Sequence, residues 1–385
     1  MTTTPTSVNL PDGKLSGCIA RPDGSLVRGR ITFTDRITAI DPASGGGDED
    51  YILPGFVDLQ LNGSHGIDVM NASADALAAL SRHLAREGAT AWMPTAVTAP
   101  IEKIAQVHES IAGAIENSRL DKSADAAAIL GMHLEGPFIS PLRLGAHPAL
   151  NLEPRADAFD RVLAMRALRL LTLAPELPGA LDAIRRLTAR AVVVSIGHTN
   201  ATLEQANAAI AAGARMFTHL FNAMRPLNHR DPGVVAAALA PSPAFAAIIP
   251  DGVHVHPAIL RLACRARGIA GMILVTDKVA LAKASAAEKN PGPARGSITI
   301  RDGAARLDDG RLAGSIISML DGVRVMVEKA GVGIGDAAVM AATNPAGLVG
   351  AGDRGRIQVG ARADLIVLSR ALELKAVFIA GRELA

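Results

Sequence analysis

A carboxylate and two imidazoles in this sequence are of the types that bind a catalytic metal ion. Glu135 ends an apolar run that begins at Leu130, and the Gly136-Pro137 pair after it stops both a helix and further strand pairing. A charged side chain held there is costly unless a cation or hydrogen-bond donors meet it. His198 and His219 close two later apolar runs. One Glu and two His form a ligand set for a divalent ion with a position open for water, which indicates metal-assisted hydrolysis.

The elements that carry these residues are predicted by an alternation that starts at residue 51. Apolar, β-rich runs alternate with Ala- and Leu-rich segments of helical period, such as Ala74–Glu87 and Leu203–Ala212. Eight such units over roughly 250–300 residues favour an α/β fold with a closed (β/α)8 TIM barrel over an open doubly wound sheet. The expected strands are Gly55–Leu61, Ala89–Thr95, Ala128–Leu134, Arg169–Leu173, Ala191–Ile196, Arg215–Leu220, Ala246–Pro250 and Gly271–Thr276.

Polar residues close nearly every one of these strands. In a barrel the carboxyl ends of the strands surround one axis on one face, so side chains far apart in the sequence can converge there. The polar strand ends are Gln60, Asn62, Thr95, Glu135, Glu176, His198, His219, Asp251 with His254, and Asp277.

Each of these residues also has a simpler explanation. A single histidine at a strand end is more often a hydrogen-bonded structural residue than a metal ligand, so His198 and His219 gain weight only together with Glu135. Glu176 precedes a Leu-Pro turn and could be a helix-start carboxylate. The remaining histidines without a partner at a strand end are expected to be structural or on the surface, namely His83, His108 and His256.

Short β-branched runs bounded by turns occur at both ends of the chain. Neither end is long enough to bury a sheet face alone, so the two are expected to combine into one discontinuous β-domain around an inserted barrel. We place the first part at residues 1–52, the barrel at 53–345 and the second part at 346–385. The polar stretch Ser44–Asp50 is expected to be a flexible loop.

Composition excludes several classes of function. The chain of 385 residues is 49% hydrophobic and 20% charged with a net charge of +2, and no Lys/Arg cluster with interleaved aromatics indicates a nucleic-acid partner. Cys18 and Cys264 are the only cysteines, which favours a reducing, cytoplasmic setting. The segment Met1–Pro5 lacks the features of a signal peptide, and no apolar run approaches about 18 residues, so neither export nor membrane insertion is expected.

The motifs around these residues closely resemble those of the N-acetylglucosamine-6-phosphate deacetylases of the amidohydrolase superfamily. The resemblance spans nearly the whole chain and implies a metal-dependent barrel with a small β-sandwich built from both termini. It is specific, because the superfamily usually opens with His-x-His on the first strand, where this chain has Gln60 and Asn62. The matching motifs are 53–63 (LPGFVDLQLNG), 133–138 (HLEGPF), 197–199 (GHT), 218–224 (THLFNAM), 251–254 (DGVH) and 275–277 (VTD).

The resemblance implies specific roles at the reacting centre. Glu135, His198 and His219 would bind one divalent ion per subunit, with zinc as the expected metal, and the Gln60/Asn62 pair would leave a second metal site unbuilt. Asp277 would take a proton from the attacking water and later give it to the leaving amine, a dual role that suits a carboxylate beside an acidified water.

It also implies contacts to an amino-sugar phosphate, the substrate class of the family. Arg230 is expected to reach a neighbouring subunit, which implies a homodimer. Such cationic and amide groups are needed because the phosphate charge must be met on entering the site. The residues implied in substrate binding are Ala146 and His147, Asn222 and Ala223, Arg230 and His254, and the loop Leu312, Ala313, Gly314 and Ser315.

One segment departs from the family pattern. Lys278 to Ala284 follows Asp277 where the family has small residues and an Ala-Pro-Ala-Gly-like turn. A lysine beside Asp277 could lower the pKa of that carboxyl, contact the substrate or point outward. The stretch Ala286–Pro293 is a further unusual loop, so the resemblance fixes the reaction type more firmly than the sugar.

Two alternatives stay open beside deacetylation of N-acetylglucosamine 6-phosphate. The first is another amidohydrolase, either a deacetylase of the galacto epimer or a cyclic amidase, although the strand Arg169–Leu173 offers no lysine for a bridging carbamate. The second is a sugar-phosphate sensor that keeps the fold without the chemistry. The intact set of Glu135, His198, His219 and Asp277 argues against the sensor.

Overall fold

A computed structural model describes residues 13–42, 49–120, 125–284 and 298–384 of the chain. The segment Met1–Pro5, most of the loop Ser44–Asp50 and the loop Ala286–Pro293 lie outside these described residues.

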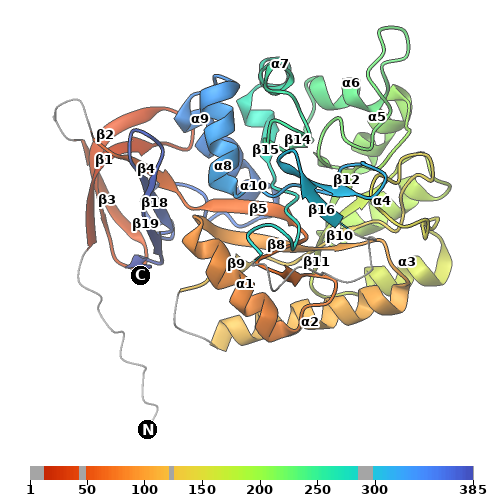
Figure 1. Ribbon diagram of the computed structural model, residues 1–385, viewed down its shortest axis with the longest axis horizontal. Helices are drawn as coiled ribbons and strands as arrows, with labels where there is room; N and C mark the ends of the chain where they lie inside the picture. Colours follow the sequence, from red (N-terminus) through yellow and green to blue (C-terminus); the bar gives the residue numbers. More distant parts are fainter. Residues whose placement is uncertain (1–12, 43–48, 121–124, 285–297, 385) are drawn as a thin grey trace.

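Eight parallel strands form the barrel at the centre of the molecule (Figure 1). Seven neighbouring pairs are hydrogen-bonded strand to strand, and the ring closes between its first and last members, where the Asp277 amide donates to Gln60 O (2.9 Å) and the Asn62 amide to Lys278 O (2.8 Å). The predicted TIM barrel is confirmed. Its strands are β5 (Phe56–Leu61), β8 (Ala89–Val97), β10 (Met132–Glu135), β11 (Leu168–Leu173), β12 (Val193–Ile196), β13 (Met216–Phe217), β14 (Phe245–Ile248) and β15 (Met272–Leu274).

The expected strand Ala128–Leu134 divides into two pieces. β9 (Ala128–Ile129) pairs with β8 beside the main path of the sheet, and β10 begins only at Met132. Between them Gly131 has φ +147°, and a Cβ there would lie 2.2 Å from the Arg169 side chain. The crowding and the backbone angle both require glycine. After a register shift between Met132 and His133, Glu135 pairs with Thr172 of β11.

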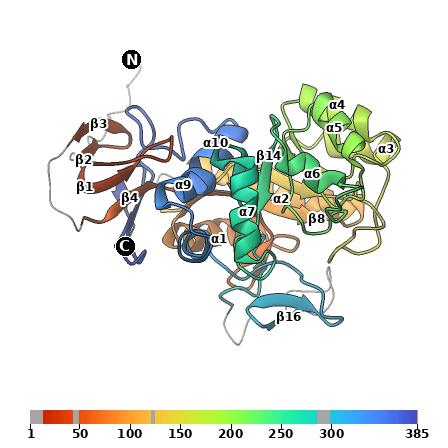
Figure 2. The ribbon, with the colours of Figure 1, turned by 90° about the horizontal axis from the view of Figure 1, so that it is seen from above.

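Helices surround the barrel, and most of them follow a barrel strand (Figures 1 and 2). α1, for example, buries Leu77, Leu80 and Leu84 in the same apolar cluster as the strand residues Phe56 and Trp92. Among the described residues no helix is long and apolar enough to cross a membrane. The helices are α1 (Ala74–Arg86), α2 (Ile101–Leu120), α3 (Ala156–Leu163), α4 (Ala180–Ala189), α5 (Leu203–Ala212), α6 (Gly233–Leu239), α7 (Pro257–Arg267), α8 (Met319–Arg324), α9 (Ile334–Ala338) and α10 (Asn344–Leu348).

A buried apolar cluster fills the barrel interior with side chains from six of its strands. The end of the barrel opposite the carboxyl ends of the strands is covered by α10. There Nδ2 of the Asn344 side chain donates to Ile269 O and Met272 O at the start of β15. Because this end is packed with apolar groups, the opposite, carboxyl-terminal end is the face left for a polar site. The strand members of the cluster include Val57, Ala91, Leu170, Met216, Ala247 and Ile273.

The two ends of the chain form one seven-stranded sheet beside the barrel, at the left of Figure 1. Phe33 on β2 and Phe378 on β19 lie edge to face, 5.6 Å apart, although three strands separate β2 from β19 in the sheet. The sheet therefore curls over a core of its own, as a small sandwich does. Its order is β20 (Arg382–Glu383), β19 (Leu374–Ile379), β18 (Leu365–Leu368), β4 (Tyr51–Pro54), β1 (Gly13–Ala20), β2 (Leu26–Phe33) and β3 (Ile37–Pro42).

Two short hairpins complete the described fold. One joins β6 (Gly63–Ser64) to β7 (Ile67–Asp68) just after β5, and the other joins β16 (Ile298–Arg301) to β17 (Ala304–Leu307) after β15. Figure 2 shows β16 standing off the body of the barrel. The segment after β17 returns to the barrel, where the Ser315 amide donates to Asp277 O (2.9 Å).

Candidate active site

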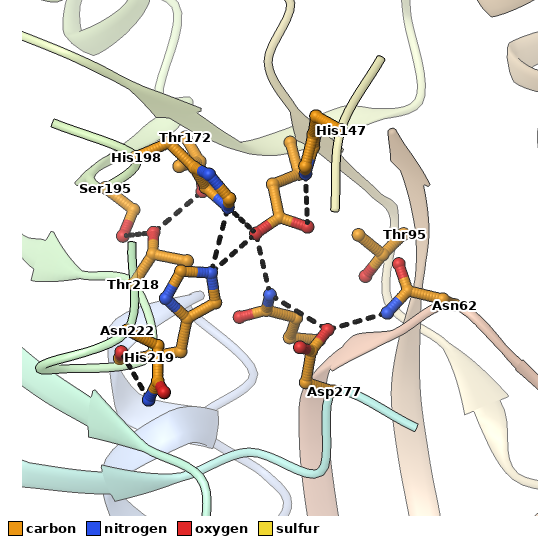
Figure 3. Close-up of polar contacts among 12 residues, drawn as sticks. Asn62, Thr95, His147, Thr172, Ser195, His198, Thr218, His219, Asn222 and Asp277 are labelled. Carbon is orange, nitrogen blue, oxygen red and sulfur yellow. Dashed lines mark hydrogen bonds and ion pairs between the residues drawn. The ribbon is translucent and has the colours of Figure 1, made fainter. Parts of the chain in front are cut away.

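Glu135, His198 and His219 meet at the carboxyl-terminal end of the barrel. Among the described residues they form the one group of three metal-ligating side chains whose ligand atoms all lie within 4.8 Å of one another. Glu135 Oε1 lies 3.2 Å from His198 Nε2 and 3.0 Å from His219 Nε2, and the two nitrogens are 3.1 Å apart. Figure 3 shows the two imidazoles facing one another, with Asp277 across from them.

The backbone that presents these groups is strained. His198, His219 and Asp277 have φ of 47°, 28° and 48°, a left-handed region that side chains other than glycine rarely adopt. Each residue directly follows a strand or its immediate extension, so the change of backbone angle turns its side chain out of the sheet toward the barrel axis. Such strain is typical of functional sites, where the surrounding structure holds it in place.

The hydrogen bonding of these ligand atoms fits a bound cation. His198 Nδ1 lies 2.9 Å from the Arg143 carbonyl oxygen, so Nδ1 must donate, and in the neutral ring Nε2 then presents a lone pair to Glu135 Oε1. Two lone pairs at that distance repel unless a cation lies between them. Tetrahedral zinc with bonds of about 2.0–2.1 Å separates its ligand atoms by roughly 3.3–3.4 Å, close to the spacing here.

The ionisable groups of this cluster stabilise one another's charged forms. Burial opposes ionisation of Glu135, but its polar contacts with the imidazoles of His147, His198 and His219 outweigh burial and hold the pKa of the carboxyl well below its ordinary value. Burial likewise opposes protonation of His219, yet the hydrogen bond and charge of Glu135 raise the pKa of that imidazole above its usual value. The site therefore favours positive charge beside an ionised carboxylate, which is the requirement for a cation site.

The carboxylate of Asp277 accepts hydrogen bonds from the side-chain amides of Gln60 and Asn62, which stand where the superfamily usually has His-x-His. Gln60 Nε2 donates to both Glu135 Oε1 (2.9 Å) and Asp277 Oδ1 (3.3 Å), and Asn62 Nδ2 donates to Asp277 Oδ1 (2.6 Å). These N–H groups lie between the two carboxylates, where a second cation would otherwise bind. Donors at that place disfavour a second metal ion.

His147 lies on the far side of Glu135 and approaches it from a loop. Its Nε2 is 3.6 Å from Glu135 Oε2, and its Nδ1 is 2.8 Å from Thr98 Oγ1. Its ring packs against that of His198 with 4.4 Å between centroids. The imidazole is thus oriented beside the metal ligands, on the wall of the pocket.

A buried layer of hydroxyl groups supports the ligands from below. His133 contacts Thr95 Oγ1 (3.1 Å) and Thr172 Oγ1 (2.9 Å), and Thr218 Oγ1 contacts both Thr172 Oγ1 (2.8 Å) and Ser195 Oγ (2.5 Å). Burial lowers the pKa of His133 to about 4, so the ring is neutral. Of these residues the sequence indicated only Thr95. Polar residues inside the otherwise apolar strands are the signal that could have indicated the rest.

A second set of polar contacts fixes the loop that carries His198. Glu176 accepts from Thr199 Oγ1 (2.5 Å) and from the Asn200 amide (2.6 Å), so it acts as a brace for this loop. The Asn200 side chain accepts from Arg143 Nε and Nη2 at 3.0 and 2.8 Å. Since the carbonyl of Arg143 bonds His198 Nδ1, these contacts set the orientation of the imidazole.

A pocket of about 220 Å³ opens above the cluster. Ser315 and Arg230 do not line it. Ser315 is buried and its hydroxyl donates to Thr276 O, while Arg230 lies on the exposed loop 226–231. Of the residues implied in substrate binding, the pocket is lined by Ala146, His147, Asn222, Ala223, His254, Leu312, Ala313 and Gly314, and also by Gly145, Ile249 and Arg311, which the sequence did not single out.

Lys278 points away from this pocket. Its side chain is 1% exposed, and Nζ donates to Glu87 Oε2 at 2.6 Å, while the other Glu87 oxygen lies 3.0 Å from His65 Nε2. Lys278 is therefore paired with Glu87 and not with Asp277, and it does not line the pocket. Lys278 is buried against Glu87.

Comparison with known proteins places the chain among metal-dependent hydrolases. Residues 51–384 match the model of the amidohydrolase family. An N-acetylgalactosamine-6-phosphate deacetylase of Escherichia coli O157:H7 is 37% identical, over 87% of this chain and 88% of its own. An N-acetylglucosamine-6-phosphate deacetylase of Bacillus subtilis (strain 168) is 36% identical, over 95% and 89%.

A solved structure is similar along almost its whole length. It is a mutant N-acetyl-D-glucosamine-6-phosphate deacetylase from Mycobacterium smegmatis in complex with N-acetyl-D-glucosamine-6-phosphate, 33% identical to this chain. The match has a TM-score of 0.86 and covers 97% of this chain and 99% of that one.

Proposed function

The chain belongs to the amidohydrolase family, and on that premise we propose that it deacetylates N-acetyl-D-glucosamine 6-phosphate, giving D-glucosamine 6-phosphate and acetate. The observation that carries the proposal is the convergence of Glu135, His198 and His219 with Asp277 in one pocket. Relatives of the same activity match this chain over most of its length, which supports the substrate class. The role would be in amino-sugar catabolism.

Glu135, His198 and His219 would hold one divalent ion, and we propose zinc. The mixed oxygen and nitrogen ligands and their near-tetrahedral spacing support that choice. A divalent ion there supplies Lewis-acid polarisation of the acetyl carbonyl and acidifies the attacking water.

The protons are moved by residues of the chain itself. Asp277 takes one proton from the attacking water as the C–O bond forms, and it returns that proton to the amine nitrogen as the C–N bond breaks. Gln60 and Asn62 donate to the carboxylate and orient it for the first of these steps. His147, oriented by Thr98, is placed to donate toward the carbonyl oxygen as it gains charge.

The sugar phosphate would be bound by groups at the rim of the pocket. The backbone of Asn222 and Ala223 is proposed to meet the phosphate together with His254, whose Nδ1 contacts Asp251 Oδ2 at 2.6 Å and whose ring thereby offers Nε2. Leu312 to Gly314 would cover the sugar, with Ser315 anchoring that loop.

We further propose a homodimer in which Arg230 enters the neighbouring pocket. Arg230 and Leu227 both lie on the exposed loop 226–231, and Leu227 is 53% exposed, an apolar side chain suited to an interface. A cytoplasmic setting is proposed because Cys18 and Cys264 are both free and buried.

The galacto epimer is the second candidate substrate, because an N-acetylgalactosamine-6-phosphate deacetylase matches at 37% identity. Acetate release from the two 6-phosphates decides between them. A tenfold or greater preference in kcat/KM for the gluco sugar is expected, on the order of 1.4 kcal/mol. The reverse preference would reassign the substrate, and release from neither sugar would refute the proposal.

Metal content on the same sample tests the ligand assignment. We expect close to one divalent ion per chain after growth with zinc, and a marked loss of both metal and activity in His198→Asn. His256→Asn is the matched control, since His256 is exposed at the N-cap of α7, where asparagine also caps well. Two ions per wild-type chain, or full metal content in His198→Asn, would contradict the assignment.

A further inference from the structure

Arg311 is the one lysine or arginine that lines the active-site pocket, counted over the residues that the structure describes. It lies in the segment 308–314 that follows β17, at the return of the β16–β17 hairpin to the barrel. Neither the strand pattern nor the motifs of the sequence indicate a role for it. Its place in the pocket is a property of the folded hairpin.

The guanidinium of Arg311 has hydrogen-bond partners within the protein, but these do not use all of its N–H donors. Nη1 donates to Gly145 O, and Nε and Nη2 each lie 2.7 Å from Asp309 Oδ2. Arginine carries five N–H donors, so these three contacts leave about two for a ligand. The side chain is 56% exposed, so an incoming anion can reach it without displacing either partner.

These anchors hold Arg311 beside the proposed phosphate position. A Cβ built on Gly145 would lie 3.5 Å from the Ala223 Cβ and 3.2 Å from His198 Cε1. Gly145 therefore lies beside Ala223, one of the pair proposed to meet the phosphate, and beside the imidazole of His198. Because Arg311 binds the carbonyl of Gly145, its guanidinium is at the same part of the pocket rim.

The charge of the substrate phosphate favours a cation at this place. A phosphate monoester brings a charge of roughly −1.5 to −2 at neutral pH, and the pocket already contains the carboxylates of Glu135 and Asp277. In a single chain Arg230 does not line the pocket, and His254 already has one ring nitrogen engaged by Asp251. Arg311 is the permanent cation that the chain itself supplies at this site.

We propose that Arg311 binds the 6-phosphate of the substrate and sets the preference for phosphorylated over unphosphorylated N-acetyl amino sugars. The planar guanidinium fork matches two phosphate oxygens at once, which an ammonium group does not. This inference rests on the proposed deacetylase function. It assigns to the segment 308–314 of the chain itself, here called the flap, a role beside the contact from the neighbouring subunit.

The test compares Arg311→Gln and Arg311→Lys with wild type on N-acetylglucosamine 6-phosphate and on unphosphorylated N-acetylglucosamine. For Arg311→Gln we expect KM for the phosphorylated sugar to rise about 10- to 100-fold with kcat within about threefold, while kcat/KM for the unphosphorylated sugar stays within about threefold. The KM of Arg311→Lys for the phosphorylated sugar should lie between those of wild type and Arg311→Gln. Arg301→Gln is the matched control, because Arg301 is exposed on β16 of the same hairpin and does not line the pocket.

Inorganic phosphate gives a second readout that needs no turnover of a poor substrate. Its inhibition constant should rise about tenfold or more in Arg311→Gln and stay unchanged in Arg301→Gln. An equal loss of kcat/KM on both sugars would show that Arg311 only ties the flap to Gly145, and unchanged constants would show that it does not contact the phosphate. A wild type that releases no acetate refutes the proposed function instead, and direct calorimetric binding of inorganic phosphate to wild type and Arg311→Gln then still decides the role of Arg311.

Discussion

Asp277 receives two amide hydrogen bonds on one carboxylate oxygen and lines the pocket beside the metal ligands. Asp277→Asn keeps an acceptor oxygen for Gln60 and Asn62 but removes the group that can take a proton. We expect kcat to fall about 10²- to 10⁴-fold, at the upper end because one residue serves two proton transfers. Steady-state acetate release with metal analysis on the same sample measures this.

Metal content and substrate affinity serve as internal controls for that variant. Both should change little, because Glu135, His198 and His219 are left intact. A loss of under about tenfold in kcat would assign the proton transfers to another residue, with His147 next in position. Loss of the metal together with activity would make Asp277 a structural residue of the site.

Lys278 presents a different kind of buried charge, one that stabilises the fold. Removing one partner of a fully buried ion pair costs about 3–5 kcal/mol, and less is expected here because Glu87 is 18% exposed and also contacts His65. Lys278→Met should therefore lower the unfolding midpoint clearly, and Lys278→Met with Glu87→Met should recover part of the loss. Thermal unfolding followed by circular dichroism measures both.

Lys103→Met is the control for that comparison, because Lys103 lies in the first turn of α2 and its Nζ donates to the amide oxygen of Asn71. It should shift the midpoint little. If Lys278→Met unfolds like wild type while kcat changes, the ion pair acts on Asp277 and not on stability.

At the scale of elements, closure of the barrel depends on a buried carboxyl group on β5. Asp58 accepts from the Thr276 hydroxyl (2.5 Å) and from the amides of Thr276 and Gln60 (3.2 Å each), which ties β5 to the end of β15. Burial raises the pKa of Asp58 from 3.8 to about 6, against the opposing effect of these hydrogen bonds. The folded protein therefore keeps this proton to higher pH than the unfolded chain does.

The sign of the resulting pH dependence follows from proton binding. Between about pH 4 and pH 6 the folded state binds more protons at Asp58 than the unfolded state, so this group's contribution to the free energy of unfolding falls as pH rises, by about 3 kcal/mol at most. Asp58→Asn mimics the protonated form. Its stability relative to wild type should rise from pH 4 to pH 7.

Urea unfolding at a series of pH values, followed by tryptophan fluorescence, measures this difference. Trp92 is the only tryptophan of the chain, is fully buried and pairs with Asp58 across β5 and β8, so it reports on the closure itself. Subtracting the free energy of unfolding of Asp58→Asn from that of wild type at each pH removes the pH dependence due to the proposed metal ligands, which both proteins share. Parallel profiles for the two proteins would show that Asp58 does not titrate in this range.

The elements also show which parts of the site the sequence can predict. The convergence of Glu135, His198 and His219 was predictable because each ends an apolar run, and the geometry of a barrel brings strand ends together whatever their separation along the chain. The direction of the Lys278 side chain was not predictable, because the sequence of a segment beyond a strand end does not indicate which neighbouring residue its side chains contact. Arg311 was also missed, because the β16–β17 hairpin folds it back over a pocket built by other strands.

For the barrel and the terminal sheet, too, some features could be predicted from the sequence and others could not. Hydrophobic period and turn chemistry predicted the eight strands and the joining of the two chain ends. The break at Gly131 was not predicted, because both halves of Ala128–Leu134 are apolar and only the Arg169 side chain of the next strand makes the crowding visible. Thr172 and Thr218 read as ordinary β-formers, since threonine favours strands whether or not its hydroxyl is used.

At the scale of the whole molecule, the proposed dimer makes each active site depend on two chains. Arg230 is exposed in one chain, and its amide donates to Asn228 Oδ1 (3.0 Å), which orders the turn that would present it. Arg230→Ala should lower kcat/KM for the phosphorylated sugar about 10- to 100-fold, mainly through KM, because a charge-assisted contact is lost. Sedimentation analysis should show a dimer for wild type and variant alike.

Mixed dimers of two defective chains test whether Arg230 acts across the interface. In a hybrid of Asp277→Asn and Arg230→Ala, one site lacks both groups, while the other combines the intact Asp277 of one chain with the intact Arg230 of its partner. Random pairing makes about half of the dimers hybrid with one restored site in two, so co-expressed chains should recover roughly a quarter of wild-type kcat/KM per chain. Each variant alone stays far below that level, and the separately purified homodimers mixed without subunit exchange are the control. If Arg230 acts within its own chain, co-expression restores nothing beyond the average of the two variants.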